Sequence, residues 1–80
     1  MKLYRIFQTV NNDYDTFDSA IVCAESEEDA RSIEPRGGVC PDKPEPYSSW
    51  AQKKDVQVEY IGEAKEGLSR GVVCASFNAG

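Results

Sequence analysis

The sequence predicts an α+β fold whose elements follow the order β-β-α-β-β. Four stretches are apolar or alternate between apolar and polar residues, which is typical of strands. Residues 16–34, TFDSAIVCAESEEDARSIE, read as a strand that runs directly into a capped helix. All four prolines lie within residues 35–54. We therefore expect one domain over residues 1–80: a four-stranded, mainly antiparallel sheet with one short helix on one face and a long Pro-rich loop.

The first two strands should form a hairpin. Residues 2–10, KLYRIFQTV, carry apolar side chains on both faces, which suggests a central position in the sheet. Residues 11–15, NNDYD, are a turn signal, because Asn and Asp tolerate left-handed conformations and form local hydrogen bonds. The second strand, about residues 16–24, then returns antiparallel to the first.

A short helix is expected over about residues 27–34. Ser26 is the expected N-cap, and Pro35 should end the helix, because the residue before a proline avoids helical geometry. A helix of this length is not stable alone, so Ala30 and Ile33 should dock on the sheet. The first turn carries three acidic residues that suit the positive end of the helix dipole: Glu27, Glu28 and Asp29.

Residues 35–54, PRGGVCPDKPEPYSSWAQKK, interrupt this regular pattern. The DKPEP segment should be extended, near polyproline II geometry. Two interpretations stay open for this loop. Trp50 and Val39 could fold back to cover the sheet, or the aromatic residues Tyr47 and Trp50 could serve a binding partner.

The last two strands should be residues 55–63, DVQVEYIGE, and residues 71–77, GVVCASF, with a turn over residues 64–70. The alternation of apolar and polar residues in 55–63 predicts a half-buried edge strand. Residues 71–77 are apolar on both faces, so we expect them, like the first strand, to form an inner strand. The expected core includes Val22, Ile33, Val58, Val73 and Phe77.

The net charge of −5 is unevenly distributed. Residues 1–34 hold eight acidic and three basic residues, whereas residues 35–80 hold equal numbers of each. Direct nucleic-acid binding is disfavoured because it needs a basic face. A partner with a basic surface fits this charge, and so does an acidic surface that serves only solubility. No apolar run approaches the length that spans a bilayer, and MKLYRIF lacks the apolar core of a signal peptide, so we expect an intracellular protein.

The residues that usually carry chemistry are sparse. The chain has no histidine, and its three cysteines, Cys23, Cys40 and Cys74, are widely spaced, which disfavours a zinc site and the usual triads. A Cys23–Cys74 disulfide would require adjacent strands and an oxidising compartment. Pairs such as Asp13 with Asp15 are better explained by solvation than by metal binding or catalysis. We therefore expect neither catalysis nor a cofactor or metal.

Three stretches, DSAIVCAESEEDAR, DVQVEYIGEA and RGVVCASFNAG, resemble short proteins encoded by bacteriophages and prophages. The resemblance covers more than half of the chain and leaves out the Pro-rich loop. The matching segments are strand cores, a helix cap and a tail, so no active residue is carried over. The resemblance implies a phage genome as the source, the bacterial cytoplasm as the setting, and an anti-CRISPR or other anti-defence role.

Together, these observations predict a small acidic protein that inhibits a bacterial host protein by protein–protein contact, with a nucleic-acid-binding component of CRISPR-type defence as the foremost candidate. Carboxylates would take the place of phosphates on a basic surface. An alternative is a structural or accessory phage protein that forms homo-oligomers through the edge strand at residues 55–63; the chain itself would be a monomer or a homodimer. The expected partner-binding residues are Asp13, Asp15, Asp18, Glu27, Glu28 and Asp29, with Tyr14, Tyr47 and Trp50 as aromatic anchors.

Overall fold

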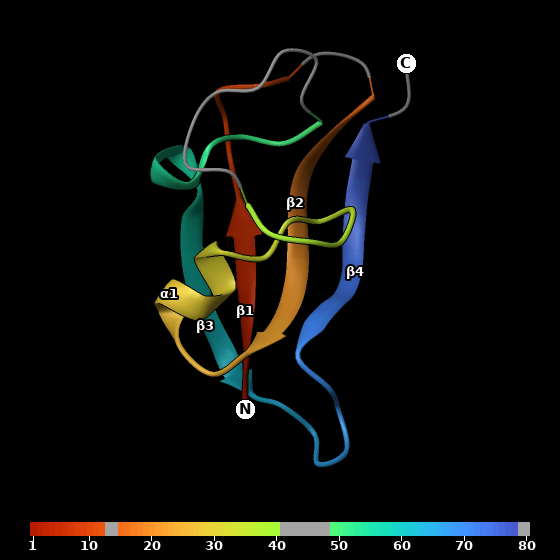
Figure 1. The fold of residues 1–80 in the computed structure, drawn as a ribbon. Coiled ribbons are helices and arrows are strands. Elements are labelled where there is room, and N and C mark those ends of the chain that lie inside the picture. Colours follow the sequence, from red (N-terminus) through yellow and green to blue (C-terminus); the bar gives the residue numbers. More distant parts are fainter. Residues whose placement is uncertain (13–14, 41–48, 79–80) are drawn as a thin grey trace.

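The computed structural model describes residues 1–12, 15–40 and 49–78, and it has the expected α+β architecture (Figure 1). The expected extended DKPEP segment, Asp13, Tyr14 and Tyr47 lie outside the described residues. In chain order the elements are β1 (Lys2–Phe7), β2 (Thr16–Ala24), α1 (Glu27–Arg31), the 3-10 turn η1 (Lys53–Asp55), β3 (Gln57–Glu63) and β4 (Gly71–Asn78).

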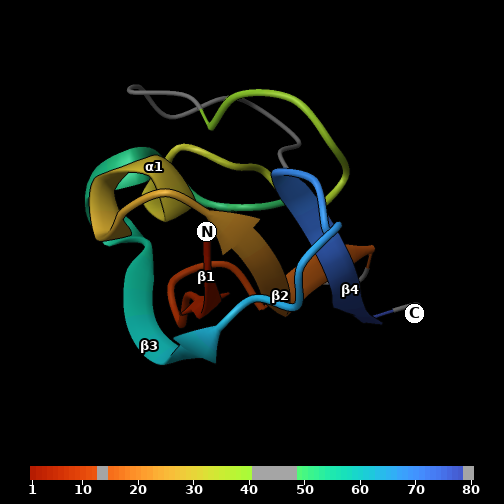
Figure 2. The same cartoon turned by 90° about the horizontal axis from the view of Figure 1, so that it is seen from below.

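The four strands form one antiparallel sheet in the order β3-β1-β2-β4. This order confirms that β1 is an inner strand and that β3 lies at an edge. The expectation that the last strand is inner is wrong, because β4 forms the opposite edge beside β2. Residues 64–70 cross the end of the sheet instead of closing a hairpin between β3 and β4 (Figures 1 and 2).

The junction between β2 and α1 follows the sequence signals closely. Ser26 is the N-cap, and its hydroxyl accepts a hydrogen bond from the Asp29 backbone N–H at 3.1 Å. The Asp29 carboxylate accepts one in return from the Glu25 N–H at 3.0 Å, so the capping bonds are reciprocal. The helix is shorter than expected and ends at Arg31. Ile33 remains buried after the helix, where it pairs with Val39 in an isolated β-bridge.

Residues 34–38, at the beginning of the expected Pro-rich loop, form a tight turn. Glu34 N–H donates to the Gly38 carbonyl, and Gly37 N–H donates to the Glu34 carbonyl. Gly37 and Gly38 have φ values of 97° and 103°, in the left-handed region where glycine is favoured. The turn brings Cys40 back, so that its N–H donates to the Ser32 carbonyl at 2.8 Å.

The core lies between one face of the sheet and a layer formed by α1, residues 32–40 and residues 49–51 (Figure 2). Trp50 is 1 % exposed, so the expectation that it covers the sheet is confirmed. Val39 is 80 % exposed and does not share that role. The buried apolar residues are Tyr4, Ile6, Ala20, Val22, Cys23, Ala24, Ala30, Ile33, Cys40, Trp50, Ala51 and Val56.

Two of the expected core residues belong elsewhere. Val22 and Ile33 are buried and Val58 packs against the core, as predicted. Val73 and Phe77 are 49 % and 48 % exposed, because β4 is an edge strand that only β2 covers among the described residues. Their apolar side chains are therefore part of the protein surface.

Candidate partner-binding surfaces

The acidic residues predicted as one binding surface form two separate groups in the structure. Asp15 and Asp18 lie at the beginning of β2, whereas Glu27 and Glu28 lie beyond its end, in the first turn of α1 (Figure 1). Six residue steps separate Asp18 from Ala24, the end of β2, a span of about 20 Å at ~3.3 Å per step. The two groups therefore cannot contact the same small feature of a partner.

Asp29 has a structural role, because its carboxylate is engaged by Arg70 and by the backbone of Glu25. The Arg70 Nε donates to the two Asp29 carboxylate oxygens at 2.8 and 3.0 Å, and Arg70 Nη2 lies 2.8 Å from Oδ1. The hydrogen bond from Arg70 has the largest effect and lowers the pKa of Asp29; burial opposes it with the second-largest effect, and the hydrogen bond from the Glu25 backbone N–H again lowers the pKa. Arg70 also donates to the Ser32 hydroxyl at 3.3 Å, which fixes the chain just before β4 against α1.

Three exposed carboxylates surround the beginning of α1. Glu28 lies 3.5 Å from Arg31 but keeps 77 % of its side-chain surface exposed. Glu25 and Glu27 are exposed and form no ion pair with any of the described residues. We call Glu25, Glu27 and Glu28 the helix-start acids. They are anchored by a capped helix whose Arg31 guanidinium donates to the Val56 carbonyl, so they are presented from a fixed support.

The predicted aromatic anchors do not join these acids. Trp50 is buried, so its assignment as an anchor is wrong: it supports the fold, and its carbonyl accepts a hydrogen bond from the Asn11 amide at 2.8 Å. Among the described residues, the exposed aromatic side chains are those of Tyr60 and Phe77, on the two edge strands. Tyr60 stacks edge-on against Tyr4 at 5.8 Å, and its hydroxyl donates to Glu63 at 3.2 Å. Sequence reasoning missed these two residues because it did not establish which side chains the edge positions expose.

The face of the sheet opposite α1 carries a mixed surface that no described helix covers (Figure 2). On β1 it presents Leu3, Arg5 and Phe7, each half-buried, with the Arg5 guanidinium 4.1 Å from the centroid of the Phe7 ring. Arg5 is opposite Glu59 in the β1–β3 register. The alternation of opposite charge and apolar surface is typical of a solvated sheet face.

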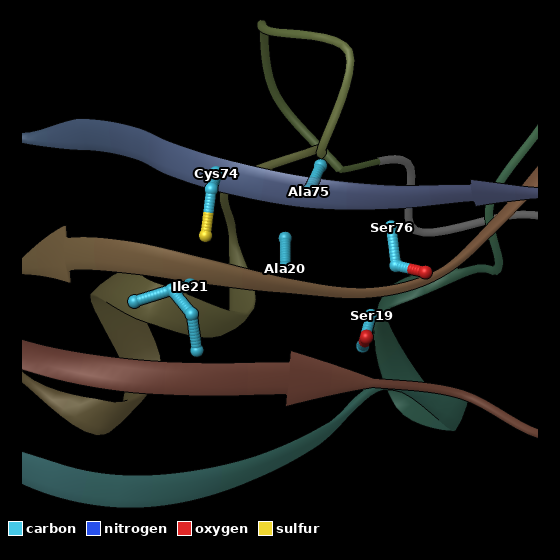
Figure 3. A pocket seen from close by; sticks show the side chains of 6 residues that line it. All are labelled: Ser19, Ala20, Ile21, Cys74, Ala75 and Ser76. Carbon is cyan, nitrogen blue, oxygen red and sulfur yellow. The ribbon is translucent and has the colours of Figure 1, made fainter.

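A shallow hollow of about 180 Å³ lies between β2 and β4 (Figure 3). It is lined by Ser19, Ala20, Ile21, Cys74, Ala75 and Ser76. Its polar groups are two hydroxyls and one thiol, and the Ser19 hydroxyl donates a hydrogen bond to the neighbouring Asp18 carboxylate at 3.3 Å. Cys23 and Cys74 are both free thiols; β2 and β4 are neighbours, but Cys74 lies opposite Ile21 and Cys23 lies opposite Gly71.

Within the part of the chain that the structure describes, no three His, Cys, Asp or Glu side chains gather as a metal site, and no helix is long and apolar enough to cross a membrane. Comparison of the chain with protein-family models, with curated proteins and with solved structures finds no match. The candidate surfaces therefore depend on geometry and charge alone.

Proposed function

We propose that this chain is a small acidic phage-type protein that inhibits a bacterial host protein by direct contact in the host cytoplasm. The observation that carries the proposal is the set of helix-start acids. These three carboxylates are exposed; Glu27 and Glu28 lie in the first turn of a capped helix, Glu25 immediately precedes its N-cap, and two of the three form no ion pair with a described residue. The proposal assigns no catalytic step to the chain.

The favoured target is a basic surface that normally holds nucleic acid, such as that of a CRISPR-type defence component. Carboxylates spaced along a short helix can occupy positions that phosphates would take, and their field steers the encounter with a basic surface. The Asp29–Arg70 pair supports this presentation indirectly. By fixing the cap, it keeps the first turn of α1 from fraying, so the helix-start acids keep their spacing.

The first experiment is a pull-down from bacterial lysate with the tagged chain, followed by mass spectrometry to identify the retained host protein. Binding kinetics of that protein are then measured for two matched variants, Glu27→Lys and Glu66→Lys. Both residues are exposed glutamates without an ion pair to a described residue, and both substitutions change the net charge equally. Glu66 lies in the connection between β3 and β4, outside the β2–α1 junction that carries the helix-start acids.

Glu27→Lys should lower the association rate at least threefold at low salt, and the difference should shrink as salt screens the charges. Glu66→Lys should have a much smaller effect. Equal effects of the two substitutions would show that only net charge matters and would remove the helix-start acids from the interface. Failure to retain any host protein would contradict the proposed function itself.

A further inference from the structure

The edge strand β4 is chemically unlike the opposite edge. From Gly71 to Phe77 it has no charged residue, whereas β3 carries Glu59 and Glu63. Charged side chains keep edge strands from pairing with other chains, and β4 lacks this protection. β2 occupies one side of β4, and no other described strand occupies the second side. We propose that β4 pairs antiparallel with β4 of a second copy of this chain.

Symmetry restricts how two copies can pair. In an antiparallel pair of identical strands, the two-fold axis is perpendicular to the sheet. Both copies of α1 then lie on the same face of a continuous sheet, and directly opposed residues must point to the same side. One residue must therefore lie directly opposite its own copy, with the axis midway between the two, because neighbouring residues on a regular strand point to opposite sides.

A β-bulge restricts the pairing further. Val73 has no opposite residue on β2, since the adjacent pairs join Val72 to Val22 and Cys74 to Ile21. An extra residue of this kind interrupts the alternation of faces and bends the strand. The part of β4 that follows Val73 is regular, because the second irregularity of this ladder is an extra residue on β2, Asp18. The regular part is the template for pairing.

This regular part pairs best with its copy when Ala75 lies directly opposite Ala75 of the second copy. Cys74 then lies opposite Ser76 of the second copy, two small side chains that share the open face of the sheet. The bulge residue Val73 adjoins this regular part and comes opposite Phe77 of the second copy, and the same contact is repeated on the other side of the axis. Both residues are about half exposed in the single chain, so dimer formation covers four exposed apolar side chains and opposes no charges.

The predicted interface is small. Five residues, Val73–Phe77, span about 17 Å of strand, so the contact area falls in the range of weak and transient complexes. We therefore expect a monomer–dimer equilibrium that depends on protein concentration. This inference does not depend on the proposed host target.

Two matched substitutions test which edge is used. Val73 and Ile61 are both 49 % exposed, and each is the bulge residue of its strand, Val73 on β4 and Ile61 on β3. Sedimentation velocity of the full chain across a wide concentration range should show dimers for the wild type and for Ile61→Lys. Val73→Lys should lower the dimer fraction at least fivefold, because it places a charge against Phe77 of the second copy.

A cross-linking variant tests the register without a disruptive charge. Ala75→Cys in a Cys74→Ser background places a thiol directly opposite its own copy, at a Cα separation of about 4.5–5.5 Å, which suits a disulfide. Mild oxidation should give a disulfide-linked dimer. Cys74→Ser alone should give no disulfide-linked dimer under the same treatment, since Cys23 and Cys40 are buried. Glu59→Cys in the same background is the matched variant on the β3 edge.

Dimers of the wild type, their loss in Val73→Lys and cross-linking through residue 75 support the inference. A wild-type chain that stays monomeric at every concentration would overturn it. Loss of dimers in Ile61→Lys but not in Val73→Lys, or cross-linking through residue 59 but not 75, would assign the contact to β3 and would also overturn it.

Discussion

Gln8 holds the β1–β2 connection together, and its removal gives the sharpest test of the fold. Its side chain is almost completely buried and forms four hydrogen bonds to the backbone. The amide nitrogen donates to the carbonyls of Asn11 and Phe17 at 2.8 and 2.9 Å. The amide oxygen accepts from the N–H groups of Val10 and Asn11 at 2.9 and 2.7 Å.

The cost of Gln8→Ala follows from these bonds. Each contributes about 0.5–1.5 kcal/mol net, and a group left without a partner in the interior costs more. Val10 is exposed, so water can replace the amide there, whereas the other groups are partly buried. We expect Gln8→Ala to lower the free energy of unfolding by about 2–4 kcal/mol. A domain of this size has a total of roughly 4–12 kcal/mol, so the loss is a large fraction.

Urea unfolding followed by circular dichroism measures this effect, with Gln52→Ala as the control. The Gln52 side chain donates one partly buried hydrogen bond to Asp55 at 3.2 Å, against four for Gln8, and its loss should cost about 0.5–1 kcal/mol. Thermal unfolding should agree, with Tm lower by at least about 8 °C for Gln8→Ala. If Gln8→Ala and Gln52→Ala were equally stable within about 0.5 kcal/mol, the side chain of Gln8 would not organise this connection.

Two further substitutions test the roles assigned to predicted site residues. Trp50→Ala should cost about 3–5 kcal/mol of stability by urea unfolding, as expected for a buried aromatic residue, while Val39→Ala at an exposed position should change it by less than about 0.5 kcal/mol. Asp29→Asn should lower stability at neutral pH because it weakens the contact with Arg70. Because folding lowers the pKa of Asp29, the stabilisation is fully present above the unfolded-state pKa of about 3.9 and is lost as the pH falls through the folded-state pKa. The stabilities of wild type and variant should therefore converge in acid. A difference in stability that stays constant with pH would contradict the role of the ion pair.

Features that depend on neighbours in the sequence were predictable. The cap at Ser26, the acidic first turn of α1 and the first hairpin depend on signals only a few residues apart. The early end of the helix was missed because Ile33 gains a β-bridge to Val39, a contact that helical spacing does not reveal. The hydrogen-bond network of Gln8 had no sequence signal, since an amide in an alternating strand reads as a solvent-facing residue.

The strand order was not predictable from apolar content. A short connection between two strands favours a hairpin, but the seven residues between β3 and β4 can extend to about 23 Å. Three strand spacings of about 4.8 Å separate the two edges of a four-stranded sheet, so this connection is long enough to reach across. The apolar faces of β4 suited an inner strand equally well, and only the three-dimensional pairing distinguishes the two arrangements.

The same limit applies to the candidate site and explains why the predicted surface divides. Acidic residues close together in the sequence are close in space only if no extended segment separates them, and β2 separates Asp18 from Glu27. Asp29, which is half-buried, forms an ion pair with the distant residue Arg70, a contact that no local pattern indicates. What remains is a smaller group of helix-start acids near one end of β2 and an uncharged edge on β4. Because these surfaces lie on different elements, charge reversal at Glu27 should leave dimer formation unchanged, and Val73→Lys should leave the charge at the helix start unchanged.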